Sequence, residues 1–334
     1  NPVKINQNDK SEFLETVISE QTEEIQPVFL DFKKDIREIK LKNDIPLYYL
    51  QNKTNELYDI HYIIEIGTNQ NKKINLALDY LNYLGTSKLT AVQLQEEFYK
   101  LASSYSIRVS EDEVTVSLSG LNENFKKASE LLEELISDPK SDEEALANLV
   151  DDILKQREDA KLSKNTILWS GMVNYAKYGK DNPFTYRLSE EELNSVTPDE
   201  IAELIKDIFS YKQRIYYYGP LDNNGISNTL NKEHRSADEL KSLKVENEFI
   251  EKDSDENKVY VVNYDMQQAE IVMLSKRNLF DRELLPYSTL YNEYFGGGMG
   301  SVVFQELRES KALAYSTFSI FQSPFTRNQL PFFT

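Results

Sequence analysis

Histidine and cysteine, the side chains that most often bind zinc, are scarce in this sequence, which contains two histidines and no cysteine. A catalytic zinc site commonly uses two or three histidine ligands, so His61 and His234 would have to meet from distant segments to form one. His61 lies in an alternating, strand-like segment, and we expect a structural or surface role for it. His234 lies in a charged segment, and we expect it to be solvated.

A run of three glycines, 296–298, precedes a helix-like segment that contains Arg308. Such a run can cradle a phosphate at a helix N-terminus, but here the Gly-Lys-Ser/Thr of a phosphate loop and a βαβ context are both missing. We therefore favour a tight turn between two helices. Ser301 is expected to cap the second helix, because no Gly-x-Ser-x-Gly nucleophile motif is present.

Other charged and aromatic residues also have simple structural explanations. Acidic clusters at 142–144 and 190–192 fall in first helical turns, where the helix dipole favours negative charge. Arg308 could pair with Glu306 or Glu309 on a solvated helix face. Tyr315, one of 21 tyrosines, could be a core residue. Taken alone, therefore, none of these residues indicates a catalytic site.

Composition excludes several classes of protein. The 334 residues include 38 lysines and arginines and 56 aspartates and glutamates, which gives a formal net charge of −18. Nucleic acids and anionic membranes bind basic surfaces, so both are disfavoured as partners. No apolar stretch approaches the roughly 20 residues of a membrane helix, so membrane insertion is not expected. A hydrophobic content of 40% excludes wholly disordered and collagen-like chains.

Hydrophobic periodicity predicts the elements that would position these residues. Strands are expected at 36–41, 46–50, 58–66, 107–110, 114–118, 214–218, 259–263, 270–274 and 315–321. Helices are expected at 72–84, 90–104, 125–136, 141–162, 166–177, 282–295 and 301–312. A capping box beginning at Ser141 would open the fourth of these helices, and the polar segment 221–257 is interpreted as an interdomain linker.

The order of these elements repeats. A strand leads to a helix ending in Tyr83-Leu84-Gly85, and a later strand leads to a helix ending in Tyr294-Phe295-Gly296; a second helix and further strands follow in both places. We therefore expect an α+β fold of tandem homologous units, each an antiparallel-rich sheet with helices packed on one face. The predicted units are a linker at 1–27, a first unit at 28–245 and a partial second unit at 255–334. The chain starts at Asn1 and stops in a strand-like segment, so we expect a fragment whose second unit is truncated.

The segment 294–315, with its glycine turn, Leu-Arg-Glu and Leu-Ala-Tyr, resembles the C-terminal half of pitrilysin/insulinase-type zinc peptidases, the inverzincins. Asn182-Pro183-Phe184 falls where this family has a His-Pro-aromatic loop, and Leu-Gly-Thr at 84–86 resembles the end of the first helix of each unit. The resemblance covers nearly the whole chain and is most specific at 294–315. It is closest to the long bacterial members that carry two halves in one polypeptide.

The resemblance also implies which half this chain represents. The family's catalytic half has an H-x-x-E-H helix that binds zinc and supplies the general base. Counting back from Gly85-Thr86 places those positions at Leu76, Asp79 and Tyr80, and the downstream zinc ligand near Asp151 or Asp152. Leucine cannot bind a metal, so the chain resembles the zinc-free half and is expected to bind no cofactor itself.

In the family, the zinc-free half contributes an Arg/Tyr pair, which the resemblance places at Arg308 and Tyr315. Both would bind substrate and stabilise the transition state at a zinc site in the other half, whether in the same polypeptide or in a companion subunit. The implied function is therefore one half of a zinc-dependent endopeptidase that degrades peptides. The alternative is a non-catalytic peptide-binding or scaffold subunit of the same family. Without cysteine, cytoplasm and periplasm are both possible, and we favour a bacterial periplasm.

Overall fold

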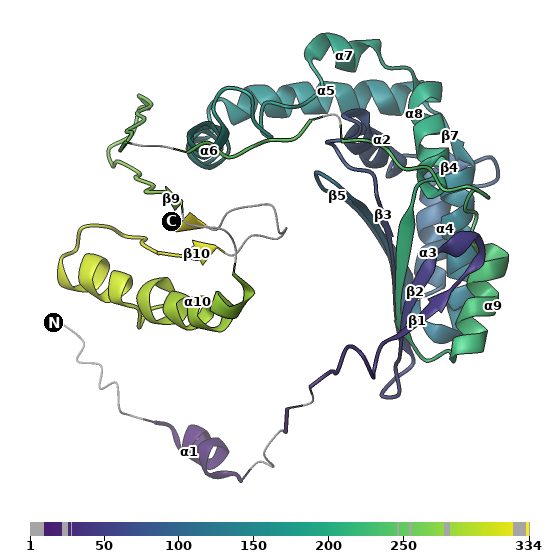
Figure 1. Cartoon of the computed structure of the whole chain (residues 1–334), viewed down its shortest axis with the longest axis horizontal. Coiled ribbons are helices and arrows are strands. Elements are labelled where there is room, and N and C mark those ends of the chain that lie inside the picture. The colour runs from purple at the N-terminus through teal and green to yellow at the C-terminus, as the bar shows by residue number, and fades with distance from the viewer. Residues whose placement is uncertain are drawn as a thin grey trace.

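A six-stranded sheet covered by helices on one face dominates the fold (Figure 1). The computed structural model describes residues 10–21, 26–27, 29–245, 247–253, 256–276, 281–322 and 332–333. The strands are β1 (Arg37–Lys40), β2 (Pro46–Gln51), β3 (Leu57–Ile64), β5 (Ser103–Val109), β6 (Val114–Leu121) and β8 (Gln213–Gly219). Their order is β1-β2-β8-β3-β6-β5, and only β2 and β8 run parallel. The predicted α+β class is confirmed.

Alternation along the strands separates a buried face from an open face of the sheet. On β3 the buried side chains are Tyr58, Ile60, Tyr62 and Ile64. Successive side chains of a strand point to opposite faces, so His61 lies on the open face, where its Nδ1 is 2.8 Å from the Ser117 hydroxyl. Tyr48 and Tyr216 stack beside it on the same face, with ring centroids 4.9 Å apart. The strand predicted at 58–66 and the structural role of His61 are both confirmed.

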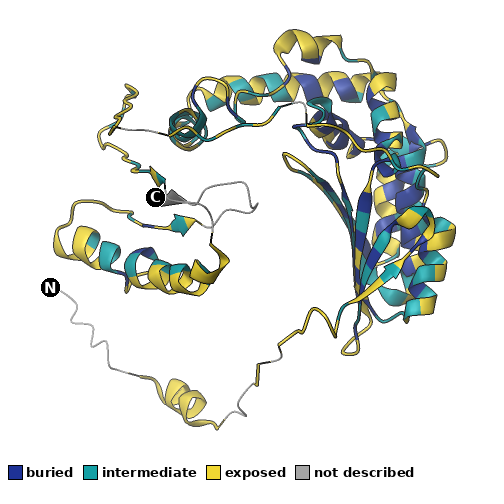
Figure 2. Cartoon of the chain, viewed as in Figure 1, coloured by how far each residue is buried: buried dark blue, intermediate teal, exposed yellow. Residues whose placement is uncertain are grey.

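Amphipathic helices provide the second layer. They are α2 (Lys73–Leu81), α3 (Ala91–Lys100), α4 (Phe125–Ser137), α5 (Glu143–Ala160), α7 (Glu190–Ser195), α8 (Pro198–Lys206) and α9 (Asn223–Glu233). Figure 2 shows their buried faces turned toward the sheet and their exposed faces turned outward. A small sheet of β4 (Gly85–Thr86) and β7 (Pro139–Lys140) joins the layer, and short helical turns lie at η1 (Lys42–Asp44), η2 (Asn122–Asn124) and η4 (Ile208–Ser210).

Threonine and aspartate side chains cap two of these helices, and one of the caps differs from the predicted residue. Thr197 caps α8, which has Pro198 in its first turn. The long helix α5, however, is capped by Asp142, whose carboxylate accepts a hydrogen bond from Ala145 N–H at 2.9 Å. Ser141, the predicted cap, instead donates a hydrogen bond to Asp199 at 2.8 Å. Serine and aspartate are equally good caps, so neighbouring capping residues leave the start of a helix uncertain by one position.

The segment around His234 differs most from expectation. Residues 223–233 form α9 rather than part of a linker, and His234 is 2% exposed instead of solvated. Its Nδ1 lies 2.7 Å from the Glu133 carboxylate, and its Nε2 lies 3.1 Å from Gln213 Oε1. Gln213 Nε2 donates to the Phe209 carbonyl, which leaves Oε1 to accept from the imidazole. The buried polar groups are therefore paired, which removes the cost of burying them.

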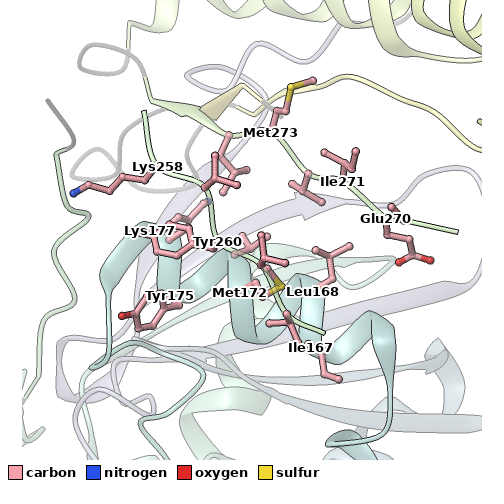
Figure 3. Close-up of a pocket in the computed structure, with 18 of the residues that line it drawn as sticks. Ile167, Leu168, Met172, Tyr175, Lys177, Lys258, Tyr260, Glu270, Ile271 and Met273 are labelled. Atoms are coloured by element: carbon pink, nitrogen blue, oxygen red, sulfur yellow. The ribbon is translucent and has the colours of Figure 1, made fainter. Parts of the chain in front are cut away.

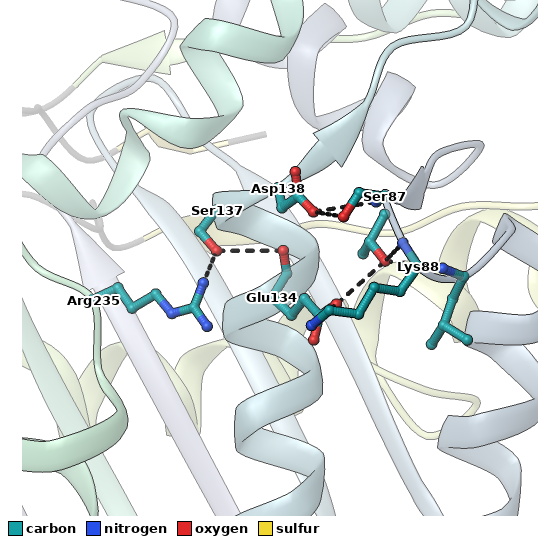
Figure 4. Close-up of polar contacts among 8 residues, drawn as sticks. Ser87, Lys88, Glu134, Ser137, Asp138 and Arg235 are labelled. Carbon is teal, nitrogen blue, oxygen red and sulfur yellow. Dashed lines mark hydrogen bonds and ion pairs between the residues drawn. The ribbon is translucent and has the colours of Figure 1, made fainter.

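Polar contacts also hold the C-terminal end of α4 (Figure 4). Asp138 accepts hydrogen bonds from the Ser87 hydroxyl and backbone N–H, and Lys88 lies 3.0 Å from Glu134. On the other side of the helix, Arg235 donates to the Ser137 hydroxyl. The turn after β4 and the chain after α9 are thus attached to the same helix end.

The second half of the chain contains shorter elements. They are β9 (Ser275–Lys276), η5 (Arg282–Leu284), α10 (Leu285–Tyr291), η6 (Asn292–Gly296), η7 (Phe304–Ser310), β10 (Phe321–Gln322) and β11 (Phe332–Phe333). The three strands form an antiparallel sheet in the order β10-β11-β9. This repeats the order β5-β6-β3 of the first sheet, so the repeat of elements inferred from the sequence extends to strand pairing. The boundaries of the two predicted units stay a prediction.

Three predicted strands are wrong or much shorter than expected. Residues 259–263 and 270–274 belong to no ladder, and only Phe321–Gln322 of the strand predicted at 315–321 pairs. A strand needs a neighbouring strand to satisfy its backbone groups. Among the described residues no such neighbour lies beside 259–263 or 270–274, so strand-like sequence alone does not produce a sheet there.

A pair of consecutive helices contacts the second half of the chain. It consists of the π-helix η3 (Thr166–Met172) and α6 (Val173–Tyr178), and its aromatic residues contact the later chain. Trp169 stacks on Phe318 with centroids 5.9 Å apart, and Tyr175 meets Tyr260 edge to face at 5.5 Å. A separate short helix, α1 (Glu12–Ser19), lies in the predicted linker. None of the helices in the described ranges is long and apolar enough to cross a membrane.

Candidate functional site

The glycine turn at 296–298 joins two helical segments, as predicted. Gly296 packs directly against the backbone of Ser319, where a Cβ atom would collide, and Gly298 has a φ of +72°. Asn292 binds both backbone groups of Phe321, donating to its carbonyl at 3.0 Å and accepting from its N–H at 2.7 Å. The turn therefore holds the helix η6 close to the segment that follows Tyr315.

Ser301 acts as the predicted cap. Its side chain is buried, and its hydroxyl accepts a hydrogen bond from Phe304 N–H at 3.3 Å. The Gln305 amide donates to the Met299 carbonyl at 2.7 Å, which fixes the start of the helical segment to the turn before it. A serine engaged in this way has its oxygen committed to the backbone, as a capping residue requires.

Arg308 and Tyr315, the predicted functional pair, lie together in the structure. The guanidinium carbon of Arg308 is 4.7 Å from the ring centroid of Phe304 and 5.1 Å from that of Tyr315. A sharp reversal after η7 makes this possible, because Leu313 N–H donates to the Leu307 carbonyl at 2.8 Å. Ala312, inside the reversal, has a positive φ of 49°. The guanidinium is thus in contact with two aromatic rings, an arrangement that stabilises a cation.

The environment of this pair is accessible and polar. Tyr315 is 83% exposed and the Arg308 side chain 37% exposed. Arg308 Nε is 3.6 Å from Glu309 Oε1, a surface contact of the kind expected from the sequence, whereas Glu306 lies 3.7 Å from Lys311 instead. Exposed ion pairs at such distances contribute little free energy. The guanidinium and the phenol are therefore available to a group that approaches from outside.

The positions equivalent to the zinc-binding helix lie on α2. Leu76 and Tyr80 are buried in the core, and the Tyr80 hydroxyl is occupied by the Asp142 backbone, donating to its carbonyl at 2.6 Å. The surrounding protein desolvates the Asp79 carboxyl, which raises its pKa even though Asn75 donates a hydrogen bond to it. This set of side chains does not fit a zinc ion, because zinc requires nitrogen, sulfur or carboxylate ligands in a common shell.

Other candidate ligands are also dispersed. Asp151 and Asp152 are exposed on α5. Across the described ranges, no group of three or more histidine, aspartate or glutamate side chains is arranged to hold a metal ion. Asn182, in the loop that resembles the family's His-Pro-aromatic loop, is buried and holds its own loop, accepting hydrogen bonds from Phe184 and Thr185 N–H. Its role is structural.

Two features of this region were not anticipated from the sequence. Phe304 was not identified, although its position four residues before Arg308 on a helix indicates that the two side chains share a face. The stacked pair Tyr48 and Tyr216 was also missed, because β2 and β8 are neighbours only in the folded sheet. Alternation within 214–218 places Tyr216 on the open face but gives no indication of its partner.

Comparison with known proteins connects the chain to one peptidase family. Residues 195–330 match the family described as the peptidase M16 inactive domain. An uncharacterized zinc protease of Rickettsia felis is 23% identical over 291 residues, covering 85% of this chain and 69% of the relative.

Two solved structures have a similar fold. A protease from Helicobacter pylori has a TM-score of 0.67 and 16% identity, covering 89% of this chain and 74% of that one. A peptidase M16 inactive domain from Pseudomonas fluorescens has a TM-score of 0.64 and 16% identity, covering 90% and 73%. The resemblance first noticed at 294–315 is confirmed. The chain is therefore similar to M16 zinc peptidases, and its residues 195–330 match the inactive domain of that family.

Proposed function

We propose that this chain is the zinc-free half of a zinc-dependent endopeptidase and supplies Arg308 and Tyr315 to a peptide bound at the zinc site of the other half. The observation that carries this proposal is the contact of the Arg308 guanidinium with the rings of Phe304 and of an exposed Tyr315. The match to an inactive M16 domain and the zinc-protease relative support the assignment to a peptidase. The zinc belongs to the other half, since α2 offers no ligand set.

The chemistry of the pair fits peptide hydrolysis. Attack on a peptide carbonyl builds negative charge on its oxygen, and a hydrogen-bond donor aimed at that oxygen is worth on the order of 3 kcal/mol. The phenol hydroxyl of Tyr315 provides one donor. The planar guanidinium of Arg308 provides several, which can also hold a backbone carbonyl or carboxylate of the substrate. Contact with the rings of Phe304 and Tyr315 limits the positions of the Arg308 guanidinium before substrate arrives, so less entropy is lost on binding.

The test is the assembled enzyme, formed with the half that carries H-x-x-E-H, acting on a quenched fluorescent peptide. We expect Arg308→Ala and Tyr315→Phe each to lower turnover about 100-fold, the loss of one transition-state donor. Arg187→Ala and Tyr287→Phe are matched controls, because Arg187 also stacks on a phenylalanine and Tyr287 is also exposed, both outside the site. Normal turnover of both site variants would refute the assignment.

A second candidate is a non-catalytic peptide-binding or scaffold subunit, which the buried Leu76 and Tyr80 favour. The two candidates differ in what the assembled protein does. An H-x-x-E-H half in the same polypeptide or in a companion subunit, together with chelator-sensitive cleavage, supports the peptidase. Peptide binding with no cleavage by the assembly supports the binding subunit. This chain alone is expected to cleave nothing, with or without a chelator.

A further inference from the structure

Side chains that ordinarily change their charge near neutral pH are few in this chain. Histidine is the residue of this kind, and the sequence contains two of them, His61 and His234. The groove of about 1970 Å³ formed by residues from 164–180 and 252–276 is lined by lysines, carboxylates and apolar side chains, and no histidine is among the described residues that line it (Figure 3). His61 lies on the open face of the first sheet, whereas His234 is buried. A buried proton that responds to neutral pH is therefore expected at His234.

Both ring nitrogens of His234 face hydrogen-bond acceptors. Nδ1 lies 2.7 Å from Glu133 Oε1, and Nε2 lies 3.1 Å from Gln213 Oε1. The orientation of the Gln213 amide is fixed, because its Nε2 donates to the Phe209 carbonyl at 3.0 Å. Glu133 Oε2 accepts a hydrogen bond from the backbone N–H of Arg235 at 3.1 Å, so both oxygens of this carboxylate are turned toward donors.

This arrangement needs one more hydrogen than a neutral imidazole and an ionised carboxylate possess. A neutral imidazole carries one ring hydrogen, and an ionised carboxylate carries none. Two hydrogens are required here, one between Nε2 and Gln213 and one between Nδ1 and Glu133. The extra proton belongs on Nδ1, because a carboxyl group is ordinarily the stronger acid of the two. The distance of 2.7 Å is that of a charge-assisted hydrogen bond.

The remaining groups around the imidazole are aromatic or are engaged elsewhere. The ring centroids of Phe209 and Tyr62 lie 4.7 and 5.1 Å from that of the imidazole. Burial and the nearby Glu133 carboxylate raise the pKa of the Tyr62 hydroxyl, so it stays neutral near neutral pH. The guanidinium of Arg235 donates to the Ser137 hydroxyl (Figure 4). Among the described residues, Glu133 is thus the titratable side chain in hydrogen-bond contact with the imidazole.

Three elements of the first unit meet at this proton. Glu133 lies on α4, Gln213 begins β8, and His234 follows directly after α9. Without the proton, a lone pair of the imidazole faces either the Glu133 carboxylate or Gln213 Oε1. Two buried acceptors that face one another are both left unsatisfied, which costs free energy. The contact that attaches the end of α9 to α4 and β8 is then lost.

We propose that the folded chain holds one extra proton between His234 and Glu133, and that loss of this proton at alkaline pH releases the end of α9 from α4 and β8. The ordinary pKa of histidine is about 6.5, so above that pH the unfolded chain lacks this proton. The folded state then binds one proton more than the unfolded state, and stability falls as the pH rises until the folded state also loses the proton. Below about pH 6.5 the stability that the pair contributes is full. This inference is independent of the role proposed for Arg308 and Tyr315.

The first test uses the whole chain with nitrogen-15 in its histidines. The sequence gives two ring systems, and His61→Gln assigns them. At pH 8 we expect both ring nitrogens of His234 to show the chemical shifts and attached hydrogens of an imidazolium. In Glu133→Gln, which keeps the shape of the side chain but not its charge, one nitrogen should show the shift of a neutral imidazole. An unprotonated ring nitrogen of His234 in the wild type at pH 8 would overturn the proposal, even if the variant fails to fold.

The second test measures stability by urea denaturation from pH 6 to pH 9. Between pH 7 and pH 8, the folding equilibrium constant of the wild type should fall about tenfold relative to that of Glu133→Gln, because one proton is released on unfolding. His61→Gln is the matched control and should follow the wild type, since it removes the other histidine from the open face. Equal pH dependence in the wild type and Glu133→Gln would contradict the trapped proton.

Release of the end of α9 is measured by trypsin cleavage after Arg235, followed by mass spectrometry at pH 7 and pH 9. Cleavage after Lys34, which is exposed near the N-terminus, corrects for the pH dependence of trypsin itself. The corrected rate should rise at least tenfold in the wild type, whereas Glu133→Gln should give the same rate at both pH values. A wild-type rate that does not rise would refute the release of α9.

Discussion

The buried contact between Glu133 and His234 allows a quantitative test of what holds the first sheet to its helices. Both side chains are almost fully buried, at 1% and 2% exposure, and they connect α4 to the residue that follows α9. Glu133 accepts from Arg235 N–H at 3.1 Å with one oxygen and contacts His234 Nδ1 at 2.7 Å with the other. Glu133→Leu would leave both of these nitrogen atoms without a partner.

The expected loss of stability follows from these two nitrogen atoms that would have no hydrogen-bond partner. A buried polar group that loses its partner costs about 1–3 kcal/mol, so two cost roughly 2–6 kcal/mol. Breaking a buried pair by removing one side typically costs about 3–5 kcal/mol, in agreement. We therefore expect Glu133→Leu to lower the free energy of unfolding by about 3–5 kcal/mol, measured by urea denaturation followed by circular dichroism. His61→Ala is the control, because its single described side-chain partner, Ser117, lies on the open face.

The double variant Glu133→Leu, His234→Leu distinguishes pairing from packing. Replacing both members of a buried pair by apolar residues of similar size is often neutral, so the double variant should be more stable than Glu133→Leu alone. Phe209 and Tyr62, whose rings lie 4.7 and 5.1 Å from the imidazole, provide apolar surroundings for the new side chains. The pair would not fasten α9 to α4 if the double variant lost as much stability as Glu133→Leu and His234→Leu lose together. The same would follow if Glu133→Leu alone lost less than about 1 kcal/mol.

Two further predictions concern the glycine turn and an acid-sensitive contact. Gly296→Ala should destabilise the second unit by about 1–3 kcal/mol, because the new methyl group collides with the Ser319 backbone, whereas Gly300→Ala meets open space and should be tolerated; limited proteolysis of both variants measures this. For Asp207, burial raises the pKa, but hydrogen bonds from Lys241, Ser210 and Tyr211 outweigh it and hold the pKa below its ordinary value of 3.8. The stability this carboxylate contributes is therefore full above that value and is lost as the pH falls through it toward the lower folded-state pKa. Stability measured from pH 6 to pH 3 should fall more for the wild type than for Asp207→Asn, and parallel curves would contradict the pairing.

The spacing of apolar residues correctly predicted those strands and helices in which the buried side chains follow a regular period along the chain. The alternation of Tyr58, Ile60, Tyr62 and Ile64 identified β3, and the apolar spacing after Phe125 identified α4. His234 was misjudged because its environment is set by Glu133, 101 residues away, and a polar residue shows no preference for burial until its partner is known. The strands predicted at 259–263 and 270–274 failed for a related reason, since a ladder depends on a neighbour that the pattern cannot supply.

The candidate site was recognised mainly from one block of residues. The sequence motif placed Arg308 and Tyr315 together, but their contact requires the reversal at Ala312, where a non-glycine residue has a positive φ. No residue type in that turn indicates such a conformation. Phe304 could have been found from helical spacing alone, whereas the stack of Tyr48 on Tyr216 required the parallel pairing of β2 with β8.

The position of β8 also has a consequence for how the first sheet assembles during synthesis. β2 and β3 leave the ribosome early, but neither can complete its hydrogen bonding until β8 has been made, after α2 to α8. Contacts between such distant segments form slowly because a long loop must close first. Until then the nascent chain has two strand edges with no partner, the kind of surface that leads to aggregation. We therefore expect the folding of this unit to end, rather than begin, with the closure of its sheet.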